Sequence, residues 1–217
     1  MKLSLRKFAL AVVVATGAFA SASAAATYNF GNIAGGDPIG DALAANFTLE
    51  VTDLGGNQVM FEVESATLIG TYFIGAIFID DSANVLGGES TAYSDANSVG
   101  DVNYLYDSKP KNFPQGNLIG FDTTASYSAE NGNGNSHAVQ PGESAAFIFT
   151  GDYNDMIAAL DDGSLSFGLH VQGIGRGSDS FVAVPHAPPP GIPLPAGGFL
   201  LLSALAGLGV ARKRMKT

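Results

Sequence analysis

One acidic segment in the middle of the chain follows the start of a calcium-binding loop. Asp95 and Asn97 supply oxygen ligands at loop positions 1 and 3, and Gly100 stands at position 6, where such a loop turns sharply. The pattern then fails, because Val99 occupies position 5 and Tyr106 replaces the bidentate glutamate. A different calcium site and a solvated acidic loop without an ion both remain open. The residues of such a site would be Asp95, Asn97, Asp101 and Asp107.

The same segment also offers side chains that contact carbohydrate. Tyr104 and Tyr106 fall on one face of a short strand, beside the polar side chain of Asn103. The chain has no tryptophan, which is the best stacking platform, and tyrosines in short runs often line the rim of a core. Fold analogy alone does not establish a function. A sugar-binding surface therefore stays an alternative hypothesis.

Motifs for catalysis are missing from the sequence. It contains no G-x-S-x-G elbow, phosphate loop or H-E-x-x-H zinc helix. The histidines are scattered at positions His137, His170 and His186. The acidic pairs at positions 80–81 and 161–162 could act in hydrolysis only if a cleft joined them, since adjacent acids on a strand point in different directions. We expect a protein that is not an enzyme and has no cofactor except, at most, calcium.

Composition excludes further classes of protein. The 217 residues include no cysteine, which rules out disulfide scaffolds and thiol-ligated metals. The formal net charge is −10, which disfavours a nucleic-acid partner because affinity for phosphate comes from clustered Lys and Arg. Residues 27–184 carry twenty acidic side chains against three basic ones, a charge of −17, and the other basic residues lie near the two ends. The ends and the middle therefore have different roles.

Residues 1–26 have the three-part layout of a secretory signal peptide. A basic start precedes an apolar stretch, residues 8–19, and a run of small residues follows. The apolar stretch is shorter than the roughly 20 residues that span a bilayer as a permanent helix. We expect signal peptidase to cut near Ala24 or Ala26.

The C-terminal end combines a proline motif, a long apolar run and a basic tail. Residues 192–211 form an uncharged run of 20 residues, which is long enough to cross a membrane. Pro193 and Pro195 disfavour helix before them, so the helix should begin near Ala196. By the positive-inside rule the tail stays in the cytoplasm and the acidic middle lies outside the inner membrane. The basic stop consists of Arg212, Lys213 and Arg214. A permanent membrane anchor is the alternative.

This C-terminal arrangement resembles the VPLPA variant of the PEP-CTERM sorting domain, found on exported proteins of Gram-negative bacteria. The motif residues are Ile192, Pro193, Leu194, Pro195 and Ala196, followed by two glycines. Ile192 stands where the family has valine, and the resemblance covers residues 192–217. It implies recognition by an exosortase, a membrane enzyme similar to a cysteine transpeptidase, which cuts near the motif. The tail would then be a removable sorting signal, as in other temporary hydrophobic tails.

Period-two patterning dominates residues 27–184 and predicts one all-β domain. Turn residues between two alternating runs predict a hairpin over residues 46–64, and an apolar run predicts a central strand over residues 72–79. Further strands are expected at 119–127, 145–149, 164–172 and 181–184, and a single helix at 152–160 with Asp152 as its N-cap. We expect eight to ten strands in a β-sandwich or jelly roll. Residues 185–191 are a proline-rich linker.

These patterns lead to one preferred function and one alternative. We expect an exported, non-enzymatic protein of the cell surface or extracellular matrix, processed by signal peptidase and by an exosortase. The resemblance adds an association with the exopolysaccharide of biofilms. The alternative is a secreted module that binds calcium or carbohydrate. Its partners would then include extracellular polysaccharide and no nucleic acid.

Overall fold

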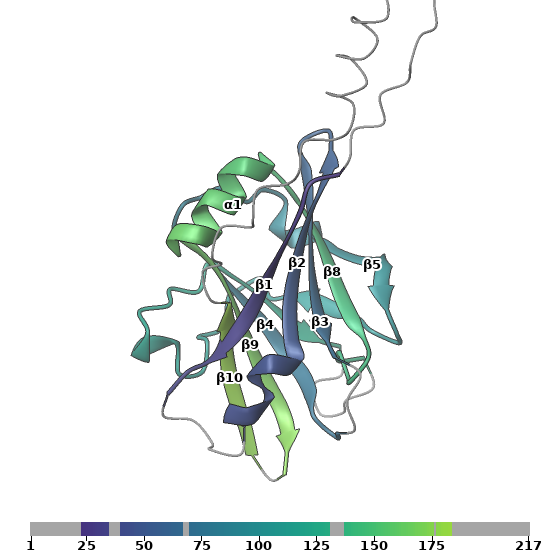
Figure 1. Cartoon of the computed structure of the whole chain (residues 1–217), viewed down its shortest axis with the longest axis vertical. Helices are drawn as coiled ribbons and strands as arrows, with labels where there is room; N and C mark the ends of the chain where they lie inside the picture. Colours follow the sequence, from purple (N-terminus) through teal and green to yellow (C-terminus); the bar gives the residue numbers. More distant parts are fainter. Residues whose placement is uncertain (1–22, 35–39, 67–69, 131–136, 176, 184–217) are drawn as a thin grey trace, which may run out of the picture.

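The computed structural model describes residues 23–34, 40–66, 70–130, 137–175 and 177–183. Within them lie ten β-strands, one α-helix and three short 3-10 helices (Figure 1). In chain order these are β1 (Ala25–Asn32), η1 (Asp41–Asn46), β2 (Phe47–Gly55), β3 (Gln58–Ser65), β4 (Phe73–Asp81), η2 (Glu89–Thr91), β5 (Tyr93–Val99), β6 (Tyr104–Tyr106), η3 (Gly116–Leu118), β7 (Ala125–Ala129), β8 (Ser144–Thr150), α1 (Tyr153–Asp162), β9 (Leu165–Ile174) and β10 (Gly177–Ala183). The prediction of an all-β domain with one short helix is confirmed for this part of the chain.

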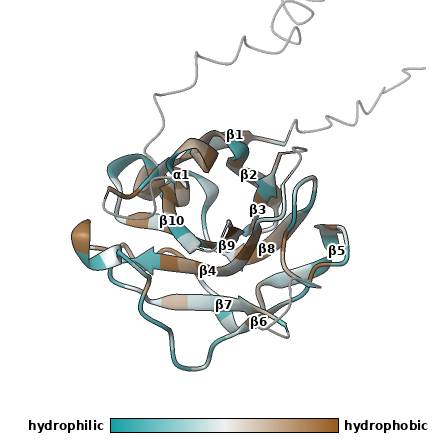
Figure 2. Ribbon diagram, turned by 90° about the horizontal axis from the view of Figure 1, so that it is seen from below, coloured by the Kyte–Doolittle hydropathy of each residue, from teal (hydrophilic) through white to brown (hydrophobic). Residues whose placement is uncertain are grey.

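All ten strands belong to one antiparallel sheet, in the order β5-β8-β3-β2-β1-β10-β9-β4-β7-β6. The first part of β1 pairs with β2 and its last part, Phe30–Asn32, pairs with β10, so β1 joins the two halves. Figure 2 shows the sheet curling round so that its two edges approach one another. There the hydroxyl of Tyr93 in β5 donates a hydrogen bond to the carbonyl of Val102, just before β6. The sheet is therefore nearly closed.

The interior of the curled sheet is filled by the inward side chains of alternating positions. In β9, Leu165, Phe167, Leu169 and Val171 face this interior and are buried, as the alternation along the strand predicts. Phe61 of β3 stacks on Phe167 across the core, with ring centroids 5.0 Å apart. Aromatic pairs of this kind add to the hydrophobic gain of burial. The core thus ties β3 in one half of the sheet to β9 in the other.

The predicted hairpin is formed by β2 and β3. Its turn contains Gly55, Gly56 and Asn57, all with positive φ, which glycine and asparagine adopt more readily than other residues. Leu49 pairs with Val63 and Val51 with Phe61, and all four of these side chains are buried. Because the side-chain period of a strand is two, this register leaves the intervening positions of both strands on the outer face.

The segment between β6 and β7 covers the outer face of β4 and β9. Phe113 in this segment lies against Phe78 of β4, with ring centroids 5.0 Å apart. A Cβ on Gly168 of β9 would lie 2.6 Å from the Phe113 ring, so a larger residue there would displace this ring. Gly168 therefore lies on the outer face of β9, as the alternation along the strand predicts, but this face is covered by the Phe113 ring. The strand predicted over residues 119–127 is too long, because β7 begins only at Ala125.

Helix α1 begins where the sequence predicts. The Asp152 carboxylate accepts hydrogen bonds from the amides of Asn154 and Asp155, at 2.8 and 3.2 Å, which satisfies two unpaired donors of the first turn. Gly163 ends the helix in the left-handed conformation, at φ 81°. The helix lies beside β1, where the Tyr28 hydroxyl donates to Asp161 at 3.0 Å (Figure 1).

Candidate functional site

The residues of the predicted calcium loop lie in different surroundings. Asp95 and Asn97 are exposed on β5, so this part of the segment is an edge strand and not a loop. The Oδ1 atom of Asp101 lies 3.3 Å from Nδ1 of His137. Asp107 lies 3.2 Å from the Lys111 ammonium and accepts hydrogen bonds from two serines of β7. Within the described residues, the three aspartates do not form a group that could share one ion. Calcium binding in this segment stays a prediction.

A different acidic cluster lies on the outer face of β2 and β3. Glu50 pairs directly with Glu62 across the hairpin, and Glu64 follows two positions later on the same face as Glu62. One carboxylate oxygen of each of these three glutamates lies within 4.8 Å of the others. Like charges directly opposite on neighbouring strands destabilise a sheet, so this cluster has an electrostatic cost. We call these residues the glutamate cluster.

The partners of the glutamate cluster are hydroxyl groups. The Ser144 hydroxyl in β8 donates to Glu62 at 2.5 Å, and the Thr48 hydroxyl in β2 donates to Glu64 at 3.2 Å. The ion pairs found among the described residues use none of the three glutamates. Three carboxylates with hydroxyl neighbours are the hard oxygen donors that Ca²⁺ and similar cations prefer. The cluster has the chemistry to hold a cation, although exposed acidic groups are common without one.

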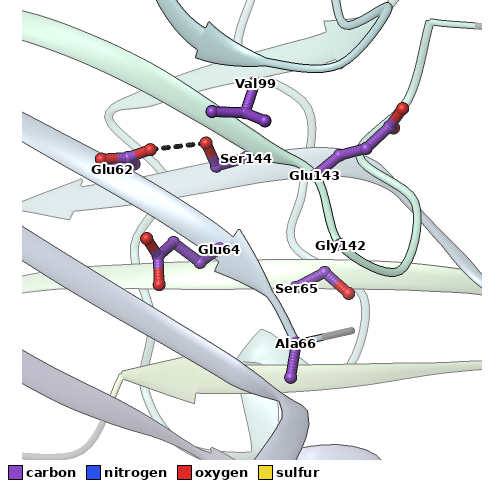
Figure 3. Close-up of a pocket in the computed structure, with 8 residues that line it drawn as sticks. All are labelled: Glu62, Glu64, Ser65, Ala66, Val99, Gly142, Glu143 and Ser144. Atoms are coloured by element: carbon purple, nitrogen blue, oxygen red, sulfur yellow. Dashed lines mark hydrogen bonds between the residues drawn. The ribbon is translucent and has the colours of Figure 1, made fainter. Parts of the chain in front are cut away.

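A hollow of about 310 Å³ opens next to this cluster, between the end of β3 and the start of β8. Figure 3 shows Glu62 bonded to Ser144 and Glu64 on the same strand, whereas Glu143 points away from both. The Glu143 carboxylate instead accepts the amide of Gln140, at 2.9 Å. The hollow is lined by Glu62, Glu64, Ser65, Ala66, Val99, Gly142, Glu143 and Ser144.

A second hollow, of about 260 Å³, lies at the seam where β5 approaches β6. Four tyrosines line it, together with Asn103, Leu105 and hydroxyl residues of η2. We call it the tyrosine seam. The tyrosines are Tyr93, Tyr104, Tyr106 and Tyr127. Tyr104 and Tyr106 share a face of β6, as predicted, but Tyr104 is buried and only Tyr106 is partly exposed.

Hydrogen bonds fix the tyrosine rings of this seam. The Tyr127 hydroxyl donates to the Glu89 carbonyl at 2.7 Å, and the Tyr104 hydroxyl donates to the Ile74 carbonyl. Burial raises the pKa of both Tyr104 and Tyr127, so these hydroxyls keep their protons further into the alkaline range than an exposed tyrosine does. Tyr106 packs edge-on against Tyr127, with ring centroids 5.7 Å apart. The seam therefore presents a rigid aromatic wall with amide and hydroxyl groups at its rim.

The acidic pairs considered for hydrolysis have structural roles. Asp80 accepts hydrogen bonds from the Ser82 hydroxyl at 2.6 Å and the Asp122 amide at 2.9 Å. The Asp81 carboxylate accepts two backbone amides of the turn that follows β4. Asp161 binds the hydroxyl of Tyr28, while Asp162 binds Ser164 after the helix. These bonds hold turns and the helix in place.

Neither of the two histidines in the described part of the chain lines one of these hollows. His170 lies on β9, where burial lowers its pKa below the ordinary value, and its Nδ1 has no hydrogen-bond partner. His137 precedes the Val139 bridge to β4 and lies beside Asp101. His186 lies outside the described residues.

Comparison with known proteins adds little to this geometry. No family model matches the chain, and no curated protein matches it. Among solved structures, one matching chain comes from work on pH-induced modulation of Streptococcus parasanguinis adhesion by Fap1 fimbriae. It is 13% identical, the match covers 77% of this chain and 98% of that chain, and the TM-score is 0.36. A likeness at this level carries no argument about function.

The sequence signals at the two ends fall largely outside the described residues. The sorting motif from Ile192 to Ala196 and the basic stop at residues 212–214 lie there, as does most of the signal peptide. No helix in the described part of the chain has both the length and the apolar character to cross a membrane. Of the predicted cleavage residues, Ala24 lies just before β1 and Ala26 lies within it.

Proposed function

We propose that the chain is an exported, non-enzymatic protein of the cell surface or extracellular matrix and a substrate of an exosortase. The observation that carries the proposal is the C-terminal order of proline motif, apolar run and basic tail, together with a signal peptide at the other end. The folded strands run from Ala25 to Ala183, so the first strand begins at the end of the expected signal peptide and the last strand ends before the C-terminal motif. The domain that would be exported is the acidic, sandwich-like sheet.

The acidic domain suits this location. A charge of −17 over residues 27–184 keeps a protein soluble outside the cytoplasm and resists self-association. The absence of cysteine in the chain makes folding independent of the redox state of the compartment. Through the resemblance of the tail, the proposed setting is the exopolysaccharide of a biofilm.

The test is the intact mass of the protein from its native cells, measured separately in membrane and secreted fractions. We expect a secreted species that lacks the first two dozen residues and ends near the motif at residues 192–196. A matched variant, Pro195→Ala, should retain its tail and accumulate in the membrane fraction. If the native protein keeps its tail through Thr217 and occurs only in membranes, residues 192–211 are a permanent anchor and the sorting proposal fails.

A second candidate function is carbohydrate binding at the tyrosine seam. Its support is the partly exposed ring of Tyr106 beside Asn103, in a hollow with both aromatic and polar walls. The test is retention of the secreted protein on the exopolysaccharide of its own cells. Tyr106→Ala should abolish retention, whereas Tyr153→Ala, on α1 away from the seam, should not. Equal retention of both variants would refute this candidate.

A further inference from the structure

The strand β1 holds the two halves of the sheet together. Residues Ala25–Asn29 pair with β2, and Phe30–Asn32 pair with β10. In the strand order, β1 stands between these two partners, so the described sheet has no other connection at that point. The stability of the domain therefore depends on an intact β1.

The first residues of β1 belong to the sequence in which signal peptidase is expected to cut. Ala25 pairs with Thr52, and Ala26 pairs with Val51 and packs against the core. These two alanines supply two of the five pairs between β1 and β2. A chain cut after Ala26 would lose both and would begin the strand with a charged amino group.

Contacts with the rest of the domain extend even further toward the N-terminus. The Asp53 amide donates to the Ala24 carbonyl at 2.9 Å, and the Ser23 hydroxyl donates to the Asp53 carbonyl at 2.5 Å. The first bond continues the β1–β2 pairing one residue beyond the end of the strand, and the second is a side-chain contact with the same residue of β2. A chain that begins at Ser23 keeps both bonds, whereas a chain that begins at Ala25 loses both but keeps the whole of β1.

The sequence offers three overlapping small-residue frames for cleavage, each of the A-x-A type. They end at Ala22, Ala24 and Ala26, and the sequence pattern does not distinguish between them. We propose that signal peptidase cuts before Ala25, in one of the two earlier frames, and that the frame ending at Ala26 is not used. This inference rests on the proposed export, and it assigns the start of the mature protein to Ser23 or Ala25.

The first test is the N-terminal peptide of the secreted protein from native cells, identified by mass spectrometry. The expected first residue is Ser23 or Ala25. A first residue of Ala26 or Thr27 overturns this inference and leaves export intact. A secreted-fraction chain that still begins at Met1 overturns the signal peptide, and with it both proposals.

Two matched variants of the full chain separate the frames. Ala22 belongs to both earlier frames, so Ala22→Asp should cause a several-fold loss of processed protein or move the first residue to Thr27. Ala26→Asp affects only the last frame and should leave the cleavage position unchanged. The readout is the N-terminal peptide in whole-cell extract, so it does not depend on how well a variant folds. The opposite pattern, with Ala26→Asp blocking cleavage and Ala22→Asp neutral, overturns the inference.

Discussion

The glutamate cluster predicts that removing one negative charge will stabilise the domain. Glu50 is the best position, because it is directly opposite Glu62 and because Gln keeps its size. Two unit charges within 4.8 Å repel by about 0.9 kcal/mol in water, and physiological salt reduces this to roughly half. Glu50→Gln relieves two such repulsions. The free energy of unfolding should therefore rise by about 1 kcal/mol.

The assay is urea denaturation of the exported domain in a chelator and about 0.15 M salt, followed by tyrosine fluorescence or far-UV circular dichroism. The matched control is Asp95→Asn, which removes the same charge from an exposed position on β5. The control corrects for the general benefit of lowering a large net charge. The gain of Glu50→Gln over the control should shrink at high salt, because screening weakens repulsion between surface charges.

The reasoning is refuted if Glu50→Gln is no more stable than Asp95→Asn in chelator. Repeating the titration with millimolar calcium tests whether an ion offsets the repulsion. If calcium binds the glutamate cluster, it should raise the urea midpoint of the native domain. The same calcium concentration should raise the midpoint of Glu50→Gln much less. An equal response of both proteins to calcium would show that the cluster is not the binding site.

Three further predictions concern stability. Asp152→Ala should lower the free energy of unfolding by about 1 kcal/mol, because it removes the N-cap of α1. Asp152→Asn can still accept hydrogen bonds from both amides and should lower it much less. Equal losses of stability in urea denaturation would contradict the capping role. Phe61→Ala should cost about 3–5 kcal/mol because it removes a buried ring that stacks on Phe167, and a loss below about 1 kcal/mol would contradict the described core. Burial lowers the pKa of His170 in the folded state. As the pH falls below about 6.5, the unfolded chain therefore binds a proton at this histidine before the folded chain does, and the free energy of unfolding decreases. His170→Gln should therefore lose less stability than the native protein between about pH 7.5 and pH 5.5, and identical losses would show that His170 does not contribute.

Local patterns in the sequence predict the parts of the fold that depend on neighbouring residues. The hairpin of β2 and β3 and the helix after Asp152 are confirmed, because turn glycines and an N-cap act within a few residues. The sequence does not predict the strand β1, because its first residues look like the end of a signal peptide and its pairing with β10 involves distant sequence. The polar edge strand β5 lacks an alternating pattern of burial, which explains why its segment suggested a loop.

The glutamate cluster shows which part of a site requires the structure. Glu62 and Glu64 can be placed on one face from their spacing alone, because strand side chains alternate. Glu50 joins them only through the register of the hairpin, which pairs it with Glu62. The alternation of apolar residues in both strands, together with the length of the turn between them, is enough to predict this register. No pattern in the sequence predicts that the Phe113 ring packs over Gly168, because this contact depends on the path of an irregular segment.

The pairing of β1 with β10 also has a consequence for when the protein can fold. Phe30 of β1 lies opposite Ala183 of β10. The two halves of the sheet can therefore join through β1 only after β10, the last described strand, has been synthesised. Sheets built from such distant pairings fold slowly, on a scale of milliseconds to seconds. A polypeptide that must be threaded through a membrane channel needs to stay extended until it has crossed. In the exported protein that we propose, this late closure would keep the chain ready for translocation during its synthesis.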